Sequence, residues 1–522
     1  MTIMLKSINY NSLGKINLSI IRRFSKSVNI YNKSKSNNEF QQPESDLYFG
    51  KFTKEEYDNA ANHVKNQINR LEKEIKGDVN IRQNIGTMPT LPAMANSAKK
   101  IRIDDLTNLL SETIKTTGPI SLSAFMRQCL THPQFGYYTT RDPLNASSGD
   151  FITSPEISSM FGEMIGIWLF STWLNQNKPQ KLNIIEFGPG RGTLMYDCLK
   201  SFNKFKKNLI QEENIEITMI EASSILRKEQ WKLLCGSNEF ITNSDGFNIS
   251  RTQWGNRVKW VDNETDITKD ENVANYIVAH EFFDALPIKS FQKTKHGWRE
   301  LVVEHTPSVD NTQLSLPEDA SSKSTSENND LLNTEFHLTL SPKETSSSVI
   351  PDLNPRFKDL PIDSRIEICP DAELYVLKMA QLLNNEKGMG SVLIIDYGIS
   401  EGIPDNTLRG IYKHKFVSPF INPGEVDLSV DVDFTNLKNV TEKMCKSFGP
   451  VEQGDWLHEL GIGYRTDQLI KANDGNVNAQ DKIYNAYQRL TGKDERSMGK
   501  IYKFLCLTPH ESKSPVGFGG SL

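Results

Sequence analysis

The sequence has little of what metal-binding and disulfide-bonded proteins need. Its 522 residues include six cysteines, and no two of them stand in a CxxC pair. A zinc site or a disulfide framework is therefore not expected, and we predict reduced, mostly buried thiols and no metal. The chain also lacks an uninterrupted run of about 18 apolar residues, which a membrane-spanning helix requires. Its formal net charge of −5 gives no indication of a nucleic-acid partner.

Acidic side chains are absent from residues 1–38. Seven basic residues and several serines occur there, and the spaced Leu and Ile residues could line one face of a helix. Such an acid-free, Arg- and Ser-containing amphipathic segment is typical of a mitochondrial presequence. We predict that residues 1–38 direct the chain to the mitochondrial matrix, with a processing point near Phe24–Ser25. An uncleaved basic tail is the alternative.

The rest of the chain divides by composition. Residues 39–102 form a polar extension rich in Asn and Lys, in which 53–77 could make a solvated helix or a short coiled coil. Compact sequence then runs over 103–510, and 511–522 form a tail. Within the compact part, about 306–354 is rich in Ser, Thr, Asn and Glu and can bury little apolar surface. We predict a disordered surface insert there.

Strand-like and helix-like patterns alternate in the compact part. Two helices separated by Gly118–Pro119 come first, and an apolar helix over Pro155–Leu174 follows. A hairpin is predicted in "IKSFQKTKHGWRELVVEH". The buried strand patterns are "LNIIEFG", "IEITMIEAS", "RVKWVD", "NYIVAHEFFDALP" and "GSVLIIDYG". This alternation predicts an α/β fold with a parallel, doubly wound sheet.

A glycine-rich turn follows the first of these strands, in "IIEFGPGRGTL". A P-loop would need a lysine and then Ser or Thr after its glycines, but Thr193 and Leu194 follow Gly192. A dinucleotide-binding turn would need a glycine at the position of Thr193, for close packing of helix and strand. The first motif is therefore excluded, and the second fits imperfectly.

The acid before this turn indicates a different ligand. Glu186 would repel a pyrophosphate but suits a ligand that carries an ammonium group, as S-adenosylmethionine does. Gly188, Gly190 and Gly192 would let the backbone approach the methionine part of that ligand. Glu221, at the end of the next strand, can accept hydrogen bonds from both ribose hydroxyls. We predict an S-adenosylmethionine site, with a glycine-rich turn that binds no ligand as the alternative.

A second group of ionisable residues follows the fourth strand, in "HEFFDALP". Glu281 and Asp284 would lie at the edge of the sheet where ligands of such folds bind. A pair of carboxylates could hold a planar guanidinium and localise its charge away from the attacking nitrogen. For a hydroxyl substrate, a base would be expected instead. Asp284 could equally cap the loop, and His280 is expected to be structural.

Five motifs in this order resemble one family. They are similar to motifs of the mitochondrial complex I assembly factor family of protein arginine methyltransferases, also called MidA. The resemblance extends from about Ile103 to Pro509 and omits the presequence, the polar extension and the Ser/Thr-rich insert. The motifs are "GDFITSPEISSMFGEMIGIW", "IIEFGPGRGTLM", "VAHEFFDALPI", "IIDYG" and "NPGEVDLSVDVDF".

The resemblance implies a class I S-adenosylmethionine-dependent methyltransferase fold, with a Rossmann-like sheet, a helical N-terminal region and insertions. It implies symmetric ω-dimethylation of an arginine in the iron–sulfur protein 2 subunit of NADH dehydrogenase, during assembly of complex I. It places Asp150 and Thr153 of "GDFIT" against the cofactor, and "HEFFDALP" against the arginine. Three further acids would lie near the substrate channel: Asp427, Asp431 and Asp433.

The chain departs from other arginine methyltransferases in one respect. Those enzymes pair two glutamates in one loop and carry a Thr-His-Trp segment, whereas this chain has Glu281 and Asp284 and no such segment. The role of Glu281 as a guanidinium clamp is therefore an analogy. Three other functions stay open: methylation of a hydroxyl or a lysine, a non-catalytic assembly chaperone, and an NAD-dependent oxidoreductase.

Overall fold

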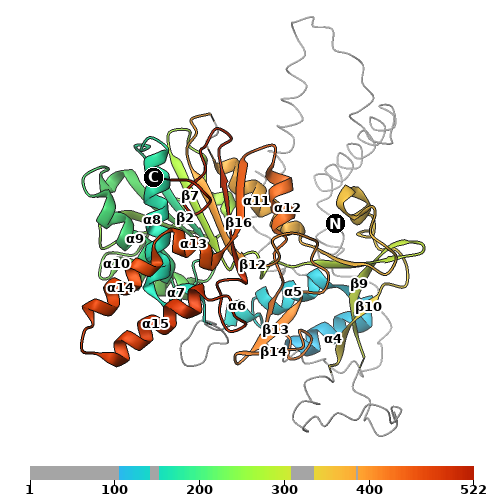
Figure 1. Cartoon of the computed structure of the whole chain (residues 1–522). Coiled ribbons are helices and arrows are strands. Elements are labelled where there is room, and N and C mark those ends of the chain that lie inside the picture. The colour runs from blue at the N-terminus through green and yellow to red at the C-terminus, as the bar shows by residue number, and fades with distance from the viewer. Residues whose placement is uncertain (1–104, 141–151, 307–333, 384–385, 522) are drawn as a thin grey trace, which may run out of the picture. The chain divides into compact units, whose positions relative to one another are not determined.

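The structure, a computed structural model, describes residues 105–140, 152–306, 334–383 and 386–521 (Figure 1). The chain divides into two compact units, Met1–Ile101 and Arg102–Leu522. All described residues belong to the second unit. The predicted presequence, the polar extension and Asp150 lie outside the described residues, and so does most of the N-terminal half of the predicted insert.

A nine-stranded sheet forms the centre of this unit. Its five middle strands, from β12 to β6, run parallel, as the sequence patterns predict. The two pairings at each side are antiparallel, which the patterns do not reveal, because a buried strand reads the same in either direction. The strands in spatial order are β16 (Lys446–Glu452), β17 (Tyr502–Thr508), β12 (Ser391–Tyr397), β7 (Ala274–His280), β2 (Leu182–Phe187), β3 (Ile215–Ile220), β6 (Arg257–Val261), β5 (Asn248–Arg251) and β4 (Ile241–Thr242).

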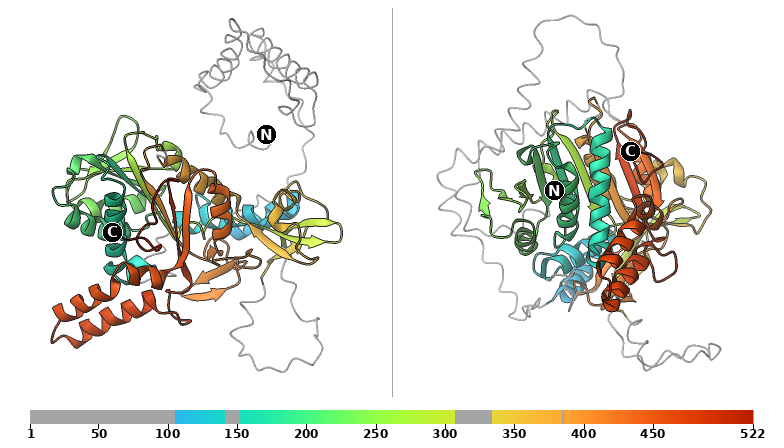
Figure 2. Two further views of the ribbon diagram at one scale, coloured as in Figure 1. Left: turned by 45° about the horizontal axis from the view of Figure 1, so that its top comes forward. Right: turned by 60° about the vertical axis from the view of Figure 1, so that its left-hand side comes forward.

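Successive residues of the middle strands face two separate apolar layers, because side chains alternate across a strand. Ile184 of β2 packs with α8 and α9, whereas Ile185 packs with α11 and α12. Helices thus cover both faces of the sheet (Figures 1 and 2), which makes the fold doubly wound. The helices are α8 (Ser159–Asn175), α9 (Thr193–Lys206), α10 (Ser224–Cys235) and α13 (Gln453–Glu459) on the first face, and α11 (Pro370–Leu382) and α12 (Phe434–Thr441) on the second.

The apolar helix predicted over Pro155–Leu174 is interrupted. Ser158 has extended backbone angles, φ −163° and ψ 138°, and ends the short helix α7 (Ser154–Ile157). Its hydroxyl then accepts a hydrogen bond from the Met160 N–H at 3.3 Å and caps α8. This break places Thr153, just before α7, on the wall of the cavity described below.

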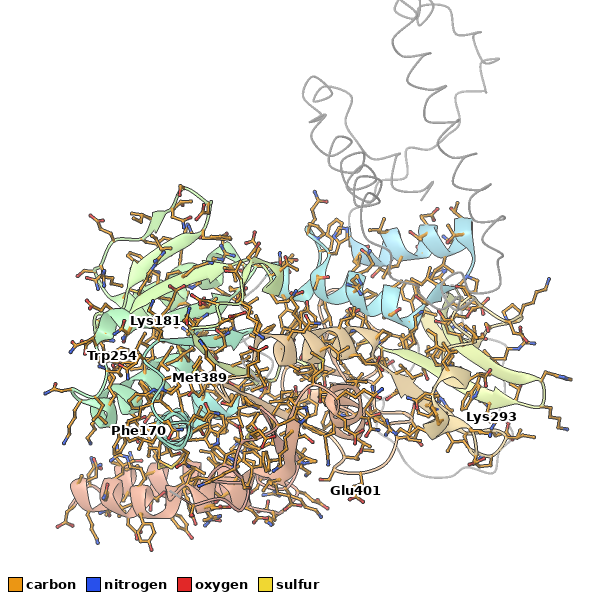
Figure 3. The ribbon with its side chains drawn as sticks, turned by 90° about the horizontal axis from the view of Figure 1, so that it is seen from above. Phe170, Lys181, Trp254, Lys293, Met389 and Glu401 are labelled. Carbon is orange, nitrogen blue, oxygen red and sulfur yellow. The ribbon has the colours of Figure 1, made fainter. Side chains whose placement is uncertain are left out.

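A second region joins α4 (Leu106–Thr117) and α5 (Leu122–Thr131) to two small sheets. Figure 3 shows that it lies across the unit from Phe170 and Trp254, with Lys293 at its far side. The predicted hairpin is confirmed as β8 and β9. The first sheet has β1 (Ile120–Ser121), β9 (Gly297–His305), β8 (Lys289–Thr294) and β11 (Arg365–Ile368), with β10 (Phe336–Leu340) also paired to β9, and the second has β14 (Lys415–Val417), β13 (Arg409–Tyr412) and β15 (Asp427–Ser429).

The structure describes the C-terminal part of the predicted insert. Residues from 334 onward are described, and Phe336 is buried in strand β10, opposite His305 of β9. The prediction of disorder up to residue 354 was therefore wrong for this part. The strand is only five residues long and is flanked by polar residues, so its apolar positions are too few to outweigh the surrounding composition.

The remaining elements follow the central sheet. Helices α14 (Ile462–Ala472) and α15 (Val477–Thr491) form a pair that projects from the sheet in the left view of Figure 2. The tail also packs, since Val516 and Phe518 contact the first apolar layer. All six cysteines are unpaired and five are buried, as predicted. Besides α7, the short helices among the described residues are α6 (Tyr137–Thr140) and four 3-10 turns, Glu212–Asn214, Glu264–Asp266, Pro351–Leu353 and Pro355–Phe357.

Within the described ranges, no helix combines the length and the apolar character needed to cross a membrane. In the same part of the chain, no group of three or more His, Cys, Asp or Glu side chains is placed so that it could hold a metal ion.

Candidate active site

A cavity of about 480 Å³ lies at the carboxyl ends of the parallel strands. Residues that end or follow five strands line it: Gly188 after β2, Glu221 after β3, Asp262 after β6, Glu281 after β7 and Tyr397 at the end of β12. The strand order reverses here, because β3 lies on one side of β2 and β7 on the other. Open α/β sheets bind their ligands at such a point.

Most of the predicted site residues meet in this cavity. Asp150 lies outside the described residues, and Gly192 lies beside the cavity, at the start of α9. The predicted residues that line the cavity are Glu186, Gly188, Gly190, Glu221, Thr153, Glu281 and Asp284.

The glycine turn bends tightly between β2 and α9. Gly192 has φ +84° and caps α9, and a Cβ added to it would lie 3.2 Å from Cγ of Gln230. Gly188 has φ +62°, and an added Cβ would lie 3.2 Å from the Phe282 ring. Both positions favour glycine because its backbone adopts positive φ without a steric penalty. The turn therefore brings bare backbone to the cavity wall.

Gln230 of α10 connects the turn to the predicted ribose acid. Its amide donates to the Gly190 carbonyl at 2.7 Å and to Glu221 Oε2 at 3.3 Å, and its oxygen accepts from the indole N–H of Trp260 at 2.8 Å. The backbone N–H of Ser223 binds the other oxygen of Glu221 at 2.7 Å. The Glu221 carboxyl is thus held in a fixed orientation at the cavity wall.

Glu186 lies at the inner end of the same half of the cavity. Its Oε2 is buried and has no hydrogen-bond partner among the described residues. Burial raises the pKa of this carboxyl to about 8, because an ionised group loses its hydration there. A ligand with an ammonium group would supply both the missing donors and the missing positive charge. Glu186, the glycine turn and Glu221 thus fit the two polar ends of S-adenosylmethionine.

Glu281 lies in the other half, in a strained conformation. Its φ of +49° is unusual for a residue other than glycine, and such strain costs about 1–3 kcal/mol and is concentrated at functional sites. Its N–H donates to the Ile395 carbonyl at 2.9 Å, which holds the turn against β12. Its Oε1 is buried without a hydrogen-bond partner in the described ranges. Burial, and then the neighbouring Asp284, raise the pKa of Glu281 to about 8.

Asp284 and Asp427 line the same cavity as Glu281 and add two further carboxyl groups. The Tyr397 hydroxyl donates to Asp284 Oδ2, while Oδ1 is buried with no partner among the described residues. Burial raises the pKa of Asp284 as well. Tyr138 donates to Asp427 Oδ1 at 2.9 Å. This half of the cavity therefore combines three carboxyl groups with tyrosine hydroxyls, and it suits a cationic ligand with several N–H donors.

His280, which the sequence analysis expected to be structural, also lines the cavity. It is buried against Phe161, with ring centroids 5.2 Å apart. Burial lowers its pKa to about 3, so the ring is neutral at physiological pH. Its Nε2 lies 3.5 Å from Glu281 Oε1.

Two of the acids assigned to the substrate channel do not line this cavity. Asp431 forms an ion pair with Arg409 at 2.7 Å. Asp433 accepts two hydrogen bonds from Arg356, at 2.7 and 3.0 Å, and caps α12. Both line a separate cavity of about 340 Å³. The prediction was therefore wrong for Asp431 and Asp433, whose charges are neutralised by arginines that the motif alone does not reveal.

With this geometry in place, known proteins identify the family. A family model described as S-adenosyl-L-methionine-dependent methyltransferase matches residues 164–451, more than half of the chain. The chain belongs to this methyltransferase family. Its cofactor is accordingly S-adenosylmethionine, and its fold is the S-adenosylmethionine-dependent methyltransferase fold that the sequence analysis expected.

Curated relatives of the methyltransferase carry one name. The protein arginine methyltransferase NDUFAF7, mitochondrial, of Xenopus laevis is 34% identical over 416 residues, which cover 79% of this chain and 86% of the relative. The human protein of that name is 32% identical over 402 residues, covering 76% and 82%. The Drosophila melanogaster homologue is 33% identical over 423 residues, covering 79% and 87%.

A solved structure has a similar fold. It is a candidate methyltransferase from Burkholderia thailandensis bound to S-adenosyl-homocysteine, with a TM-score of 0.56 and 21% sequence identity. The similarity covers 79% of this methyltransferase and 92% of the bacterial chain. It supports the fold and the arrangement of the sheet.

Several residues of the site were not found from the sequence. They are Gln230, Tyr138, Tyr397, Tyr502 and Asp396, which come from four separate parts of the chain. Only Tyr397 and Asp396 had a usable signal, because "IIDYG" ends a buried strand at the ligand-binding edge. The others come together only through the tertiary fold.

Proposed function

We propose that this methyltransferase is a protein arginine methyltransferase of the mitochondrial matrix. In this proposal it symmetrically dimethylates the ω-nitrogens of an arginine in the iron–sulfur protein 2 subunit of NADH dehydrogenase, during assembly of complex I. The names of the curated relatives support the arginine specificity and the mitochondrial location. The subunit and the symmetry of the product rest on the resemblance of the five sequence motifs alone, and the matrix rests on the presequence-like composition of residues 1–38.

The observation that carries the arginine proposal is the pair of unsatisfied carboxyl oxygens. Glu281 Oε1 and Asp284 Oδ1 are buried, and neither accepts a hydrogen bond in the described part of the chain, although His280 Nε2 lies 3.5 Å from Glu281 Oε1. A buried acceptor without a donor costs about 1–3 kcal/mol. A guanidinium presents five N–H donors in a planar fork, whereas a lysine ammonium is a compact charge with three. Two carboxyl groups from one loop therefore suit a guanidinium better than they suit an ammonium group.

The residues of the chain then have distinct tasks. S-adenosylmethionine, when bound, supplies a methyl group on a positively charged sulfur. Glu281 and Asp284 hold the guanidinium and turn one nitrogen toward the cofactor half of the cavity. As the N–C bond forms, the bond from the methyl group to the sulfur would break and the sulfur would leave as a neutral thioether, while the nitrogen loses a proton, which one of these two carboxylates accepts. Tyr138, Tyr397 and Phe282 line the cavity and exclude water from the reacting atoms.

Proton release on substrate binding follows from the same groups. Burial, and then the neighbouring Asp284, raise the pKa of Glu281 to about 8, so without a substrate this carboxyl is largely protonated at neutral pH. A guanidinium stays charged at every physiological pH, and it would displace the proton. Binding of an arginine peptide should therefore tighten as the pH rises toward 8.

A peptide assay with matched acceptors tests the proposal. The full chain, S-adenosylmethionine and an arginine peptide should yield dimethylarginine, while the same peptide with lysine should stay unmodified by mass spectrometry. Glu281→Gln should lower the rate at least about tenfold, since a hydrogen bond to a charged group contributes about 1.5–3 kcal/mol. Glu304→Gln on β9, away from the cavity, is the control. Methylated lysine, or full activity of Glu281→Gln, would count against the proposal.

A non-catalytic chaperone predicts a different result. Glu281→Gln in cells that lack the native protein should then restore complex I as well as the wild-type chain does. If assembly requires the carboxylate, the chaperone alternative is excluded.

A further inference from the structure

Two adjacent residues at the end of β12 hold the loop that carries Glu281 and Asp284. The buried carboxyl of Asp396 accepts hydrogen bonds from the backbone N–H groups of Phe283, at 3.0 Å, and of Asp284, at 3.3 Å. Its other oxygen accepts from the N–H of Tyr397 at 2.9 Å. Asp396 thus fixes the backbone of the loop. It forms no hydrogen bond with the side chain of Asp284, which therefore needs a separate restraint.

Tyr397 restrains that side chain. Its hydroxyl donates to Asp284 Oδ2 and lies 2.6 Å from Oγ of Ser429. The same hydroxyl is placed to donate to both oxygens, but a phenol has one proton, so Asp284 and Ser429 compete for it. A carboxylate is the stronger acceptor, and the proton is therefore directed mainly at Asp284.

The Tyr397 ring is itself held on two sides. The Arg409 guanidinium lies over it, 4.6 Å from the ring centroid. The ring of Tyr502 meets its edge, with centroids 5.4 Å apart. Arg409 is fixed in turn by its ion pair with Asp431. Asp431, one of the three acids that the resemblance assigned to the substrate channel, therefore acts on the site indirectly, through Arg409 and Tyr397.

We propose that Tyr397 is a positioning residue of the methyl-transfer reaction: it binds Asp284 Oδ2 so that the unpaired Oδ1 faces the substrate guanidinium. This inference rests on the proposed arginine specificity. A carboxyl group that is held by one oxygen presents the other in a single orientation, and the substrate then does not have to order it. Without the phenol, the carboxyl of Asp284 could turn away or retain a proton.

The test is Tyr397→Phe in the full chain, with an arginine peptide and saturating S-adenosylmethionine. We expect kcat/KM for the peptide to fall about 10- to 100-fold, the effect of losing a hydrogen bond to a charged group. The cofactor Kd should stay within about twofold. The acidic limb of the pH profile should move to higher pH, because the Tyr397 hydrogen bond lowers the pKa of Asp284 against the effect of burial.

A matched control removes a buried phenol elsewhere. The Tyr276 hydroxyl on β7 donates to Gln176 at 2.8 Å and is not part of the cavity. Tyr276→Phe therefore loses one buried hydrogen bond, as a purely structural change would, and should leave the pH limb in place. If Tyr397→Phe fails to fold, Ser429→Ala removes the acceptor that competes with Asp284 for the phenol proton, and it should move the pH limb in the opposite direction, to lower pH.

Asp284→Asn separates this inference from the proposed function. If Asp284→Asn methylates the arginine peptide as fast as the wild type, the carboxyl clamp of the proposed function is wrong. If Asp284→Asn is slow while Tyr397→Phe retains the wild-type rate and pH profile, only the positioning role is wrong. A slow Tyr397→Phe with an unmoved pH limb would also overturn it. The proposal expects Tyr397→Phe to have no added effect in the Asp284→Asn background.

Discussion

At the scale of single residues, Glu221 offers the sharpest test of the cofactor half of the cavity. Its carboxyl is held by Ser223 and Gln230 and faces the cavity. Glu221→Gln keeps the shape but loses one acceptor for the ribose hydroxyls. We expect the Kd for S-adenosylmethionine, measured by calorimetry, to rise about 10- to 100-fold. Glu229→Gln, a change at a half-buried position of α10 that does not line the cavity, should leave the Kd unchanged. Equal affinities in both variants would contradict the assignment.

Glu221 and its partner Gln230 show which site residues could be predicted from the sequence and which could not. Glu221 and Glu186 could be assigned from the sequence, because each lies at the end of a recognisable strand in a known type of sheet. Gln230 could not, although it binds both the turn and Glu221. A glutamine inside an amphipathic helix has no distinctive pattern, and only the packing of α10 brings its amide to the turn.

At the scale of elements, an ion pair attaches the projecting helices α14 and α15 to helix α8, which covers the central sheet. Arg465 of α14 makes two hydrogen bonds to Glu163 of α8, at 2.6 and 3.0 Å, and the Glu163 side chain is only 10% exposed. Arg465→Met would leave that carboxylate without its partner. Because the arginine is partly exposed, we expect a loss of about 1–2 kcal/mol in the free energy of unfolding. Hydrogen exchange should accelerate in α14 and not in β2.

Lys493→Met is the control for that experiment. Lys493 also binds two carboxylates, but all three side chains are substantially exposed, so little stability should be lost. If Arg465→Met is as stable as Lys493→Met, the projecting helix pair is held by its apolar contacts instead.

Element types were largely predictable, and their interruptions were not. The alternation of buried strands and amphipathic helices identified the parallel core, since burial on both faces gives continuous apolar runs. The break at Ser158 was missed because the long apolar pattern of the helix that follows dominates the segment. Strand β10 was missed for the opposite reason, since its polar flanks dominate the local composition. Both errors arise where tertiary contacts override a local pattern.

At the scale of the whole molecule, the cavity links stability to pH. Glu186 and Glu281 each have a pKa of about 8 in the folded state, against about 4.3 in an unfolded chain. Between these values the folded chain keeps protons that the unfolded chain has lost. The free energy of unfolding should therefore fall as the pH rises, by about 1.4 kcal/mol per pH unit for each group. His280 opposes this trend below about pH 6.5, because its lowered pKa makes the folded state bind fewer protons.

The window from pH 6.5 to 8 isolates the carboxyl groups, because His280 is neutral there in both states. We expect Glu186→Gln to flatten the pH dependence of unfolding by urea in this window by about 1 kcal/mol per pH unit. The variant should gain stability relative to the wild type as the pH rises. S-adenosylmethionine should have a similar flattening effect on the wild-type chain, since its ammonium group favours the ionised form of Glu186. An unchanged slope in Glu186→Gln would mean that this carboxyl is ionised in the folded protein. The cavity would then hold a negative charge before any ligand arrives, and cofactor binding would release no proton from it.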